Sequence, residues 1–505
     1  MFTKLAQFSI DVASHSSNMN GRRRPLPRMR TLGLFCVSLF ICAIMFIAVP
    51  TLLQFLDDVG YGLRPGDVLR RVSRKSHVRT HGLPFRDSWG AYSPYQPQAQ
   101  YSVPAGCQVK MANVIQRHGA RYPTEGATER IQKGIASMQA VPAWSEPLFE
   151  FIPAYRYHMG INDQVPFGAR QSFDSGVEAA RRYEKLGRPF VRASDSERVI
   201  SSATNWTAGY VHIAEGSLPD ILIVDEKQNT TLDDSMCPFA AGAEAQKSAW
   251  ASSIAQATIN RLRTAALPPS SLMMDPDDLL NLMSLCPFET LGSSKFDTPE
   301  RHEHTSPWCG LWTKEDIQKF EYWMDLDKYY GTGYGNALGP VQGIGYIAEL
   351  LARLTRTPVA KWDANGRTSV NHTLDDDART FPLDHSLYVD FSHDNQIIPI
   401  ISALGILQPE QPLNTTKMDT TRSWVVSSIV PFSGRLVIEL LECGGDAGRA
   451  QQVRAIINDA VMQLPKPCRN NPRDGLCDLD DFIKSQGFAV GGAQKEWIQC
   501  RTGDA

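Results

Sequence analysis

The chain of 505 residues is 42% hydrophobic and 21% charged, and its formal net charge is −3. This composition is typical of a globular protein, and the slightly acidic balance argues against a nucleic-acid-binding protein. A chain of this length forms one large domain with insertions, or two to three smaller domains.

An apolar segment near the N-terminus predicts a membrane anchor. Residues 1–30 are polar and end in an arginine cluster, and the uncharged run Leu32–Val49 is long enough to span a bilayer. A cleaved signal peptide is the alternative, but the run is longer than an ordinary signal core and no A-x-A-like site closes it. We therefore expect a basic cytosolic tail at 1–30, a transmembrane signal anchor at 31–56 and an exposed stalk at 57–85.

The cysteines and glycosylation sequons indicate on which side of the membrane the rest of the chain lies. Basic residues flank the apolar run on both sides, so the positive-inside rule does not settle the orientation. Eight cysteines follow the run without CxxC spacing, which favours a disulfide framework over a zinc site. Sequons occur at Asn205, Asn229, Asn371 and Asn414. We expect a single-pass type II protein whose large domain is lumenal or extracellular; Arg70-Arg71 is either a processing site that releases this domain or part of a plain linker.

Strand-like and helix-like segments alternate beyond the stalk. The expected strands are 109–115, 189–191, 386–391 and 433–442, and the expected helices are 128–139, 172–186, 344–355 and 397–404. Residues 200–335 are mostly helix-like, most clearly at 243–266 and 316–330. This pattern predicts an α/β fold, a central mostly parallel sheet flanked by helices, built from about 86–199 and 336–505, with an inserted helical region at about 200–335.

The stretch QRHGARYP at 116–123 carries the strongest chemical signal. It follows a predicted buried strand and places His118 between Arg117 and Arg121. Arginine guanidinium groups bind phosphate oxygens bidentately and stay charged at any working pH. A solvated surface turn is the plainer interpretation, but the preceding strand and the lack of an acidic partner favour a site that holds a dianion against a nucleophilic nitrogen.

Two further motifs make the resemblance specific. RASDSERV at 192–199 and SHDN at 392–395 follow RHGARYP in the order seen in histidine acid phosphatases, branch 2 of the histidine phosphatase superfamily. The similarity runs from about Trp89 to Cys500 and is greatest to fungal phytases of the phytase A type. It implies a phosphoglycerate-mutase-like fold and hydrolysis of phosphate monoesters through a phosphohistidine, with an acidic pH optimum. It implies neither cofactor nor metal, and no ligand motif such as HExxH occurs.

Roles for individual residues follow from the resemblance and from the chemistry. His118 is the expected nucleophile. Asp394 is the expected general acid, although an Asp before an apolar helix is also a common N-cap. Arg198 is expected to be a structural salt-bridge partner. The expected phosphate clamp consists of Arg117, Arg121, Arg192 and His393. The implied disulfides are Cys107–Cys443, Cys237–Cys500, Cys286–Cys309 and Cys468–Cys477.

The sequence departs from the fungal phytase pattern in two places. Those proteins commonly carry several lysines just after RHGARYPT, whereas TEGATERIQK at 124–133 has Glu125 and Glu129 there. Asp195 stands where the family usually has a small residue. Acidic groups at the entrance repel a polyphosphate, so a broad-specificity acid phosphatase competes with a phytase that acts on inositol polyphosphates. A non-catalytic phosphate-binding protein is less favoured, because the nucleophile, clamp and acid are all present.

Overall fold

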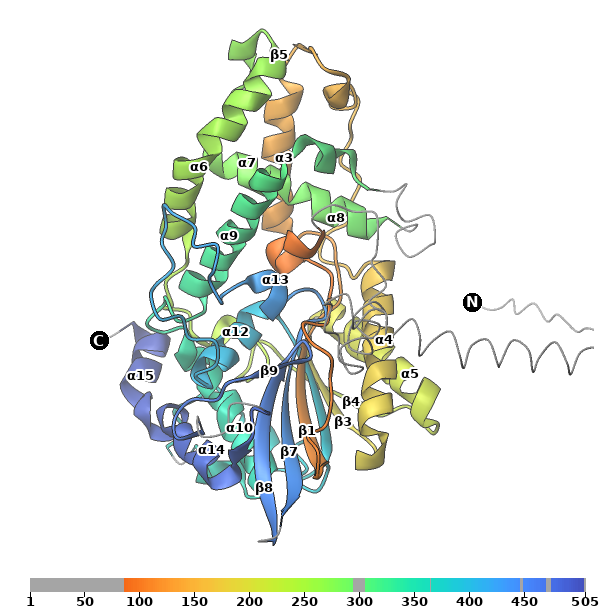
Figure 1. The fold of residues 1–505 in the computed structure, drawn as a ribbon, viewed down its shortest axis with the longest axis vertical. Coiled ribbons are helices and arrows are strands. Elements are labelled where there is room, and N and C mark those ends of the chain that lie inside the picture. The colour runs from red at the N-terminus through yellow and green to blue at the C-terminus, as the bar shows by residue number, and fades with distance from the viewer. Residues whose placement is uncertain (1–85, 294–304, 364, 446–447, 469–473, 504–505) are drawn as a thin grey trace, which may run out of the picture. The chain divides into compact units, whose positions relative to one another are not determined.

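The computed structural model describes residues 86–293, 305–363, 365–445, 448–468 and 474–503 (Figure 1). The expected tail, anchor and stalk, including Arg70-Arg71, lie outside these residues. Within the described ranges, no helix combines the length and the apolar character that crossing a membrane requires.

A central sheet forms the base of the domain (Figure 1). Its strand order is β10-β8-β7-β1-β6-β3-β4, and β9 pairs with β8 at the side. The strands are β1 (Cys107–Arg117), β3 (Phe190–Ser194), β4 (Ile221–Val224), β6 (Leu387–Ser392), β7 (Arg435–Gly445), β8 (Gly448–Ile457), β9 (Ala460–Met462) and β10 (Cys477–Asp478). A separate two-stranded ribbon joins β2 (Ala143–Trp144) to β5 (Ala266–Leu267).

The sheet is mixed, so the prediction of a mostly parallel sheet is wrong. Strands β1, β6, β3 and β4 are parallel, whereas β7 pairs antiparallel with β1, and β8 pairs antiparallel with β7, β9 and β10. Strand β8 pairs with β7 from Leu436 opposite Ile457 to Gly445 opposite Gly448. The polar sequence of β8, GRAQQVRAII, hides this strand from an argument based on apolar runs, since antiparallel strands near a sheet edge tolerate polar side chains.

Helices cover both faces of the sheet. On one face, α4 (Pro166–Tyr183) and α5 (Glu197–Ala214) pack on Ala112 and Val114 of β1. On the other, α10 (Ile344–Thr355) and α12 (Asp394–Ala403) share a core with Met111 and Ile115. Because β1 is buried on both sides, it has a nearly continuous apolar run. Four further helices are α11 (His372–Asp375), α13 (Val426–Ile429), α14 (Leu479–Ser485) and α15 (Gln494–Thr502).

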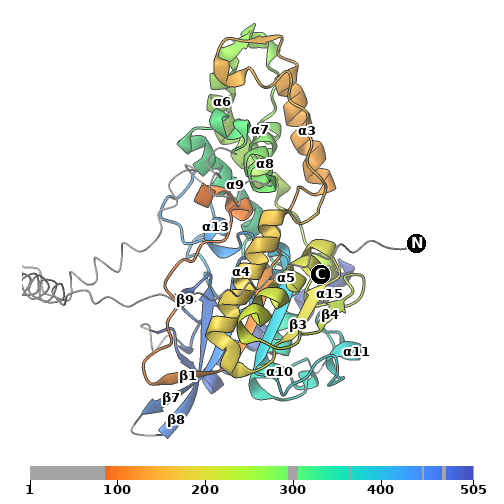
Figure 2. The same ribbon diagram turned by 90° about the vertical axis from the view of Figure 1, so that its right-hand side faces the viewer.

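A helical layer stands beyond the carboxyl ends of the parallel strands (Figures 1 and 2). It does not coincide with the expected insertion at 200–335, because α5 packs on the sheet and β4 belongs to it. The layer also includes α3 (Glu125–Gln139), which precedes that range and packs on α7 (Pro276–Met283). Its helices are α3 (Glu125–Gln139), α6 (Glu244–Ala265), α7 (Pro276–Met283), α8 (Leu285–Gly292) and α9 (Lys314–Gly331). Side-chain caps fix three of its helix starts, Thr124 at α3, Asp275 at α7 and Thr313 at α9.

Candidate active site

The parallel strands β1, β6 and β3 end side by side, and the three sequence motifs lie at their carboxyl ends. In the register of the sheet, Arg117 of β1 lies opposite Ser392 of β6, and Ala193 of β3 lies opposite Phe391. The residues that follow these strands therefore meet at the same edge of the sheet. The rings of His118 and His393 lie 5.6 Å apart, centroid to centroid. The fold thus brings RHGARYP and SHDN together, as the sequence predicts.

The imidazole of His118 is oriented for attack through Nε2. Its Nδ1 lies 2.9 Å from the carbonyl oxygen of Gly119, which can only accept, so Nδ1 carries the hydrogen and the Nε2 lone pair is free. Gly119 is needed for close packing, because a Cβ there would lie 2.2 Å from the carbonyl oxygen of Gly168. Burial, and then the charges of Arg117, Arg121 and other cations, hold the pKa of His118 well below its usual value. The lowered pKa favours the neutral form of the ring, in which the Nε2 lone pair is available.

Three guanidinium groups surround His118, those of Arg117, Arg121 and Arg198. Arg117 is fully buried, Arg121 is 9% exposed and Arg198 is half-buried. The Nε–H of each is buried and has no acceptor among the described residues. Burial, and then the charge of Arg121, lower the pKa of Arg198, while burial remains the main cause for Arg117 and Arg121. Buried donors without acceptors are costly, and a phosphoryl group bound over His118 would supply those acceptors.

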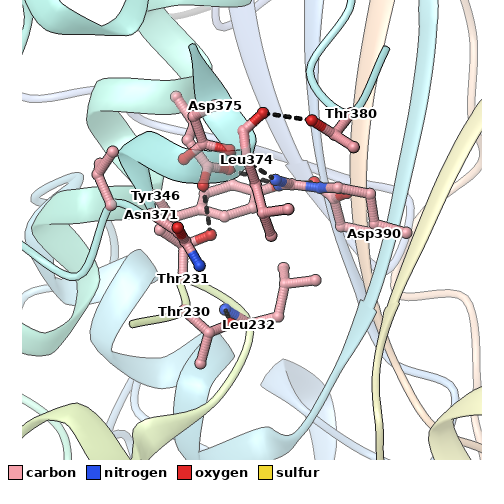
Figure 3. Close-up of polar contacts among 12 residues, drawn as sticks. Thr230, Thr231, Leu232, Tyr346, Asn371, Leu374, Asp375, Thr380 and Asp390 are labelled. Carbon is pink, nitrogen blue, oxygen red and sulfur yellow. Dashed lines mark hydrogen bonds and ion pairs between the residues drawn. The ribbon is translucent and has the colours of Figure 1, made fainter. Parts of the chain in front are cut away.

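Arg192 does not belong to this clamp, so its assignment from the sequence is corrected. Its Nε lies 2.7 Å from Oδ1 of Asp390, and its Nη2 donates to Glu349. Asp390 also accepts from Arg353 at 2.7 Å and from the hydroxyl of Tyr346 at 3.0 Å. Figure 3 shows Asp390 and Tyr346 in this buried network. Because Arg192 lies within the sheet at the middle of β3, its guanidinium pairs with the neighbouring strand and helix, behind the site.

The buried network supports the site from behind. The hydroxyl of Thr231, which Figure 3 labels, donates to Glu349 at 2.6 Å. The Thr231 carbonyl accepts from Gln396 of α12 at 2.7 Å. The adjacent Leu232 carbonyl accepts from Ser392 at 2.6 Å. Arg192 and its partners thereby fix the end of β6, the start of α12 and the segment at 230–232 relative to one another.

Arg198, and not Arg192, faces His118 and His393. It lies in the first turn of α5, where helical spacing suggested a structural salt bridge. No carboxylate lies within ion-pairing distance of it in the described ranges, and its Nη2 lies 3.2 Å from Nδ1 of His393. The charge pattern of RASDSERV contains two arginines six residues apart, and only the tertiary structure shows which of them faces His118.

Asp394 begins α12 beside the nucleophile. His393 is the N-cap and Asp394 the first helical residue, so Asp394 is not the cap of its helix. Its Oδ2 lies 3.2 Å from Nη2 of Arg117 and 3.0 Å from Nζ of Lys328, a buried residue of α9. Burial acts to raise the pKa of Asp394, but Arg117 and Lys328 hold it well below its usual value. The unliganded site therefore holds Asp394 as a carboxylate between two cations.

Two residues of the site were missed by the sequence analysis. Lys328 lies inside a helix, and a single lysine in the run WMDLDKYYG carries no signal that it reaches the strand ends. Glu226 follows β4, and its Oε1 lies 2.9 Å from Nε2 of His393. It stands between charged and polar residues of a loop, DEKQN, where a solvated turn is the ordinary interpretation.

The four disulfides implied by the resemblance are all formed: Cys107–Cys443, Cys237–Cys500, Cys286–Cys309 and Cys468–Cys477. The first follows from sheet register, which places the two cysteines directly opposite each other on β1 and β7. The second joins α15 to the segment after β4 that lies near the site. Of the sequon asparagines, Asn229 and Asn414 are exposed, and Asn205 and Asn371 are half-buried.

Comparison with known proteins agrees with this geometry. A family model described as the histidine phosphatase superfamily (branch 2) matches residues 108–458. Phytase A of Aspergillus terreus is 37% identical over 437 residues, covering 82% of this chain and 90% of that protein. Phytase A of Aspergillus awamori is 36% identical over 443 residues, with the same coverage.

Solved structures share the fold. The phytase from D. castellii superimposes with a TM-score of 0.61 at 20% identity, covering 81% of this chain and 86% of that one. The Bifidobacterium longum multiple inositol polyphosphate phosphatase, in complex with inositol hexasulfate, gives a TM-score of 0.56 at 13% identity, covering 81% and 98%. Taken with the family match and the sequence identity to the fungal proteins, the chain belongs to branch 2 of the histidine phosphatase superfamily, as a phytase-like histidine acid phosphatase.

Proposed function

We propose that this protein hydrolyses phosphate monoesters through a covalent intermediate on His118. The observation that carries the proposal is the set of three guanidinium groups, each with a buried Nε–H that lacks a partner in the described part of the chain, around a neutral imidazole whose Nε2 is free. Phosphoryl transfer depends mainly on positioning and on neutralising charge. Arg117, Arg121 and Arg198, with His393, supply both.

In the first step, Nε2 of His118 attacks phosphorus in line with the leaving alcohol, and a P–N bond replaces the P–O bond. Asp394 gives a proton to the leaving oxygen. In the second step, Asp394 takes a proton from water, and that water displaces the phosphoryl group from His118. Dividing one difficult displacement into two easier ones is the general advantage of a covalent intermediate.

The electrostatics of Asp394 connect this mechanism to acidic pH. A carboxylate held between Arg117 and Lys328 does not carry a proton in the empty site. A bound phosphoryl group attracts Arg117 and adds negative charge beside Asp394, and both effects raise the pKa of Asp394. Activity that requires a protonated Asp394 falls as pH rises past the pKa that Asp394 has in the complex. A pH–rate profile that is flat from acid to neutral would contradict this role.

The test is hydrolysis of p-nitrophenyl phosphate by the purified full-length protein and by His118→Ala. We expect turnover by the wild type and none above background by the variant. His158→Ala, which removes an exposed histidine, is the matched control and should match the wild type. Equal activity in the wild type and His118→Ala would refute a phosphohistidine at this position.

A second candidate, a broad-specificity acid phosphatase with little preference for phytate, is supported by the start of α3. Glu125 and Glu129 are exposed there. The cations of the same helix are engaged elsewhere: Lys133 lies 3.0 Å from Asp278, and Arg130 donates to Asn281 at 3.2 Å. A substrate with six phosphates meets acidic side chains before it meets free cations. Turnover of phytate and of p-nitrophenyl phosphate, compared at the same acidic pH, decides between a phytase and this alternative.

We further propose that the protein is anchored through residues 31–56 with its catalytic domain lumenal or extracellular, with release as a soluble form by cleavage at Arg70-Arg71 as an alternative fate. The four disulfides and the sequons support this proposal, because both belong to an oxidising secretory environment. Endoglycosidase treatment should increase electrophoretic mobility, and added protease should reach the domain only after intact vesicles are opened. Cleavage of the domain by protease added to intact vesicles, whose cytosolic face is outward, would contradict the orientation.

A further inference from the structure

The two ring nitrogens of His393 face opposite kinds of partner. Nε2 lies 2.9 Å from Oε1 of Glu226 and 3.3 Å from the hydroxyl of Ser194. Nδ1 lies 3.2 Å from Nη2 of Arg198. A carboxylate only accepts and a guanidinium only donates. The empty site therefore favours neutral His393 with its hydrogen on Nε2 and a lone pair on Nδ1.

Binding of a phosphoryl dianion changes the partner that Nδ1 of His393 faces from a hydrogen-bond donor to an acceptor. Arg198 has a buried Nε–H without an acceptor among the described residues, and an anion bound over His118 would offer its guanidinium an acceptor. The Nδ1 lone pair of His393 then faces an anionic oxygen instead of a donor. Two acceptors repel each other, so His393 contributes to binding only if Nδ1 gains a proton.

We propose that Glu226 is a positioning residue that holds His393 through Nε2 and stabilises its imidazolium, so that binding of the phosphoryl dianion is coupled to uptake of one proton from solvent at Nδ1. In the complex, Nε2–H donates to Glu226 and Nδ1–H donates to the anion. This inference rests on the proposed function of the site, and it adds a residue and a proton that the proposed mechanism does not contain.

The charges around His393 favour this protonation. Carboxylates reach it from two directions: Glu226 from the loop after β4, and Asp233, whose Oδ2 lies 3.8 Å from Nε2, with Asp234 beside it. The opposing cation is Arg198, which the anion attracts in the complex. The titratable and charged groups that face the ring are Glu226, Asp233, Asp234, Asp394, Arg198 and His118.

Glu226 is held in place and ionised. Its Oε1 also accepts from the Ser194 hydroxyl at 2.7 Å, and its backbone N–H donates to Oδ1 of Asp195 at 3.3 Å. Burial acts to raise the pKa of Glu226, but its hydrogen bonds from His393 and Ser194 hold the pKa below its usual value. Asp195, an unusual residue in its motif, thus supports the turn that carries Glu226.

The test measures binding of sulfate to the full-length protein by calorimetry near pH 6. Sulfate is a dianion that does not titrate in this range, so any proton taken up comes to the protein. Titrations in two buffers of different ionisation enthalpy give the number of protons bound. Proton uptake at Asp394 is common to both proteins, so the difference between them reports on His393. We expect Glu226→Gln to take up fewer protons than the wild type, by a difference that approaches one. Equal uptake in both proteins would overturn the proposal.

Kinetics separate a positioning role from a merely structural one. The carboxylate stabilises the protonated ring that the anion needs, so Glu226→Gln should raise KM for p-nitrophenyl phosphate about tenfold at pH 6 and less at pH 4. Its kcat should change much less. Glu226→Asp, which keeps the charge, should recover part of the proton uptake, and Glu150→Gln, which removes an exposed carboxylate, should behave as wild type. A pH-independent loss in Glu226→Gln that Glu226→Asp does not relieve would overturn the proposal.

Two further outcomes are informative. Glu226, Asp233 and His393 hold ligand atoms within 4.8 Å of one another, a grouping that also suits a divalent cation. Loss of wild-type activity in EDTA and its recovery with Zn²⁺ would overturn the proton assignment. The proposed function has a separate test, since it fails if His118→Ala retains wild-type turnover. Sulfate binding does not depend on that result, because sulfate binds without being hydrolysed.

Discussion

The assignment of Arg198, rather than Arg192, to the phosphate clamp can be tested with a pair of substitutions. Arg198→Ala removes a donor that faces His118 and leaves the buried network behind the site intact. Arg192→Met removes the centre of that network but no side chain that faces His118. The two variants should therefore fail in opposite ways, one in catalysis and the other in folding.

The expected magnitudes differ accordingly. Loss of one preorganised donor to the developing negative charge lowers kcat by about 10²–10³-fold. Breaking a buried ion pair costs about 3–5 kcal/mol, and the lower end applies to Arg192, because Arg353 still pairs with Asp390. With an unfolding entropy of about 2.1 cal/mol/K per residue, a domain of about 420 residues then loses about 3 °C in Tm.

The assay combines p-nitrophenyl phosphate kinetics with thermal unfolding on the same protein preparations. Arg198→Ala should keep the wild-type Tm and lose activity, while Arg192→Met should lose Tm and keep most of its activity at low temperature. Arg198→Lys is the matched control: it keeps the charge but not the planar fork, and should recover part of the activity. A stable, inactive Arg192→Met beside an active Arg198→Ala would refute the assignment.

Three further predictions concern the acid and the entrance. In single-turnover experiments, Asp394→Asn should slow the phosphorylation of His118 by an alkyl phosphate about 10²–10³-fold but that by p-nitrophenyl phosphate far less, because nitrophenolate leaves without a proton; equal losses in this first step would argue against protonation of the leaving group. Lys328 lowers the pKa of Asp394, so Lys328→Gln should raise that pKa and keep the acid protonated to higher pH. The descending limb of the pH profile of kcat should then move to higher pH; a limb at the same pH would count against the contact between Lys328 and Asp394. Replacing Glu125 and Glu129 by lysine should raise kcat/KM for phytate about tenfold relative to p-nitrophenyl phosphate at low salt, and less at high salt; no change would remove these side chains from specificity.

Local sequence was sufficient for the strands that bear the site. The buried run before RHGARYP, the apolar strand before SHDN and the helix at 344–355 all lie where the sequence predicts them. Burial of a strand on both faces selects an apolar run, which can be recognised without knowing its neighbours. His118, His393 and Asp394 follow such strands directly, and for this reason their meeting at one edge was predictable.

Position in the chain did not determine which charges face the nucleophile. Arg192 and Arg198 share one motif, yet one points into a buried ion network and the other toward His393. The difference arises because Arg192 belongs to a strand whose neighbours, β6 and α10, carry the acids that pair with it. Lys328 reaches the site from a helix of the upper layer, and no local pattern encodes that approach.

The sequence by itself therefore determined which residue types meet in this protein: a histidine among arginines, an aspartic acid beside it, and a disulfide framework. The tertiary structure decided which arginine faces the site and not a buried carboxylate, which lysine holds Asp394 as a carboxylate, and which glutamate contacts His393. The physical reason is that a residue type and its place after a strand are local properties. The partner that neutralises a buried charge comes from whichever strand or helix packs against it, and that is settled only when the sheet and the helical layer come together.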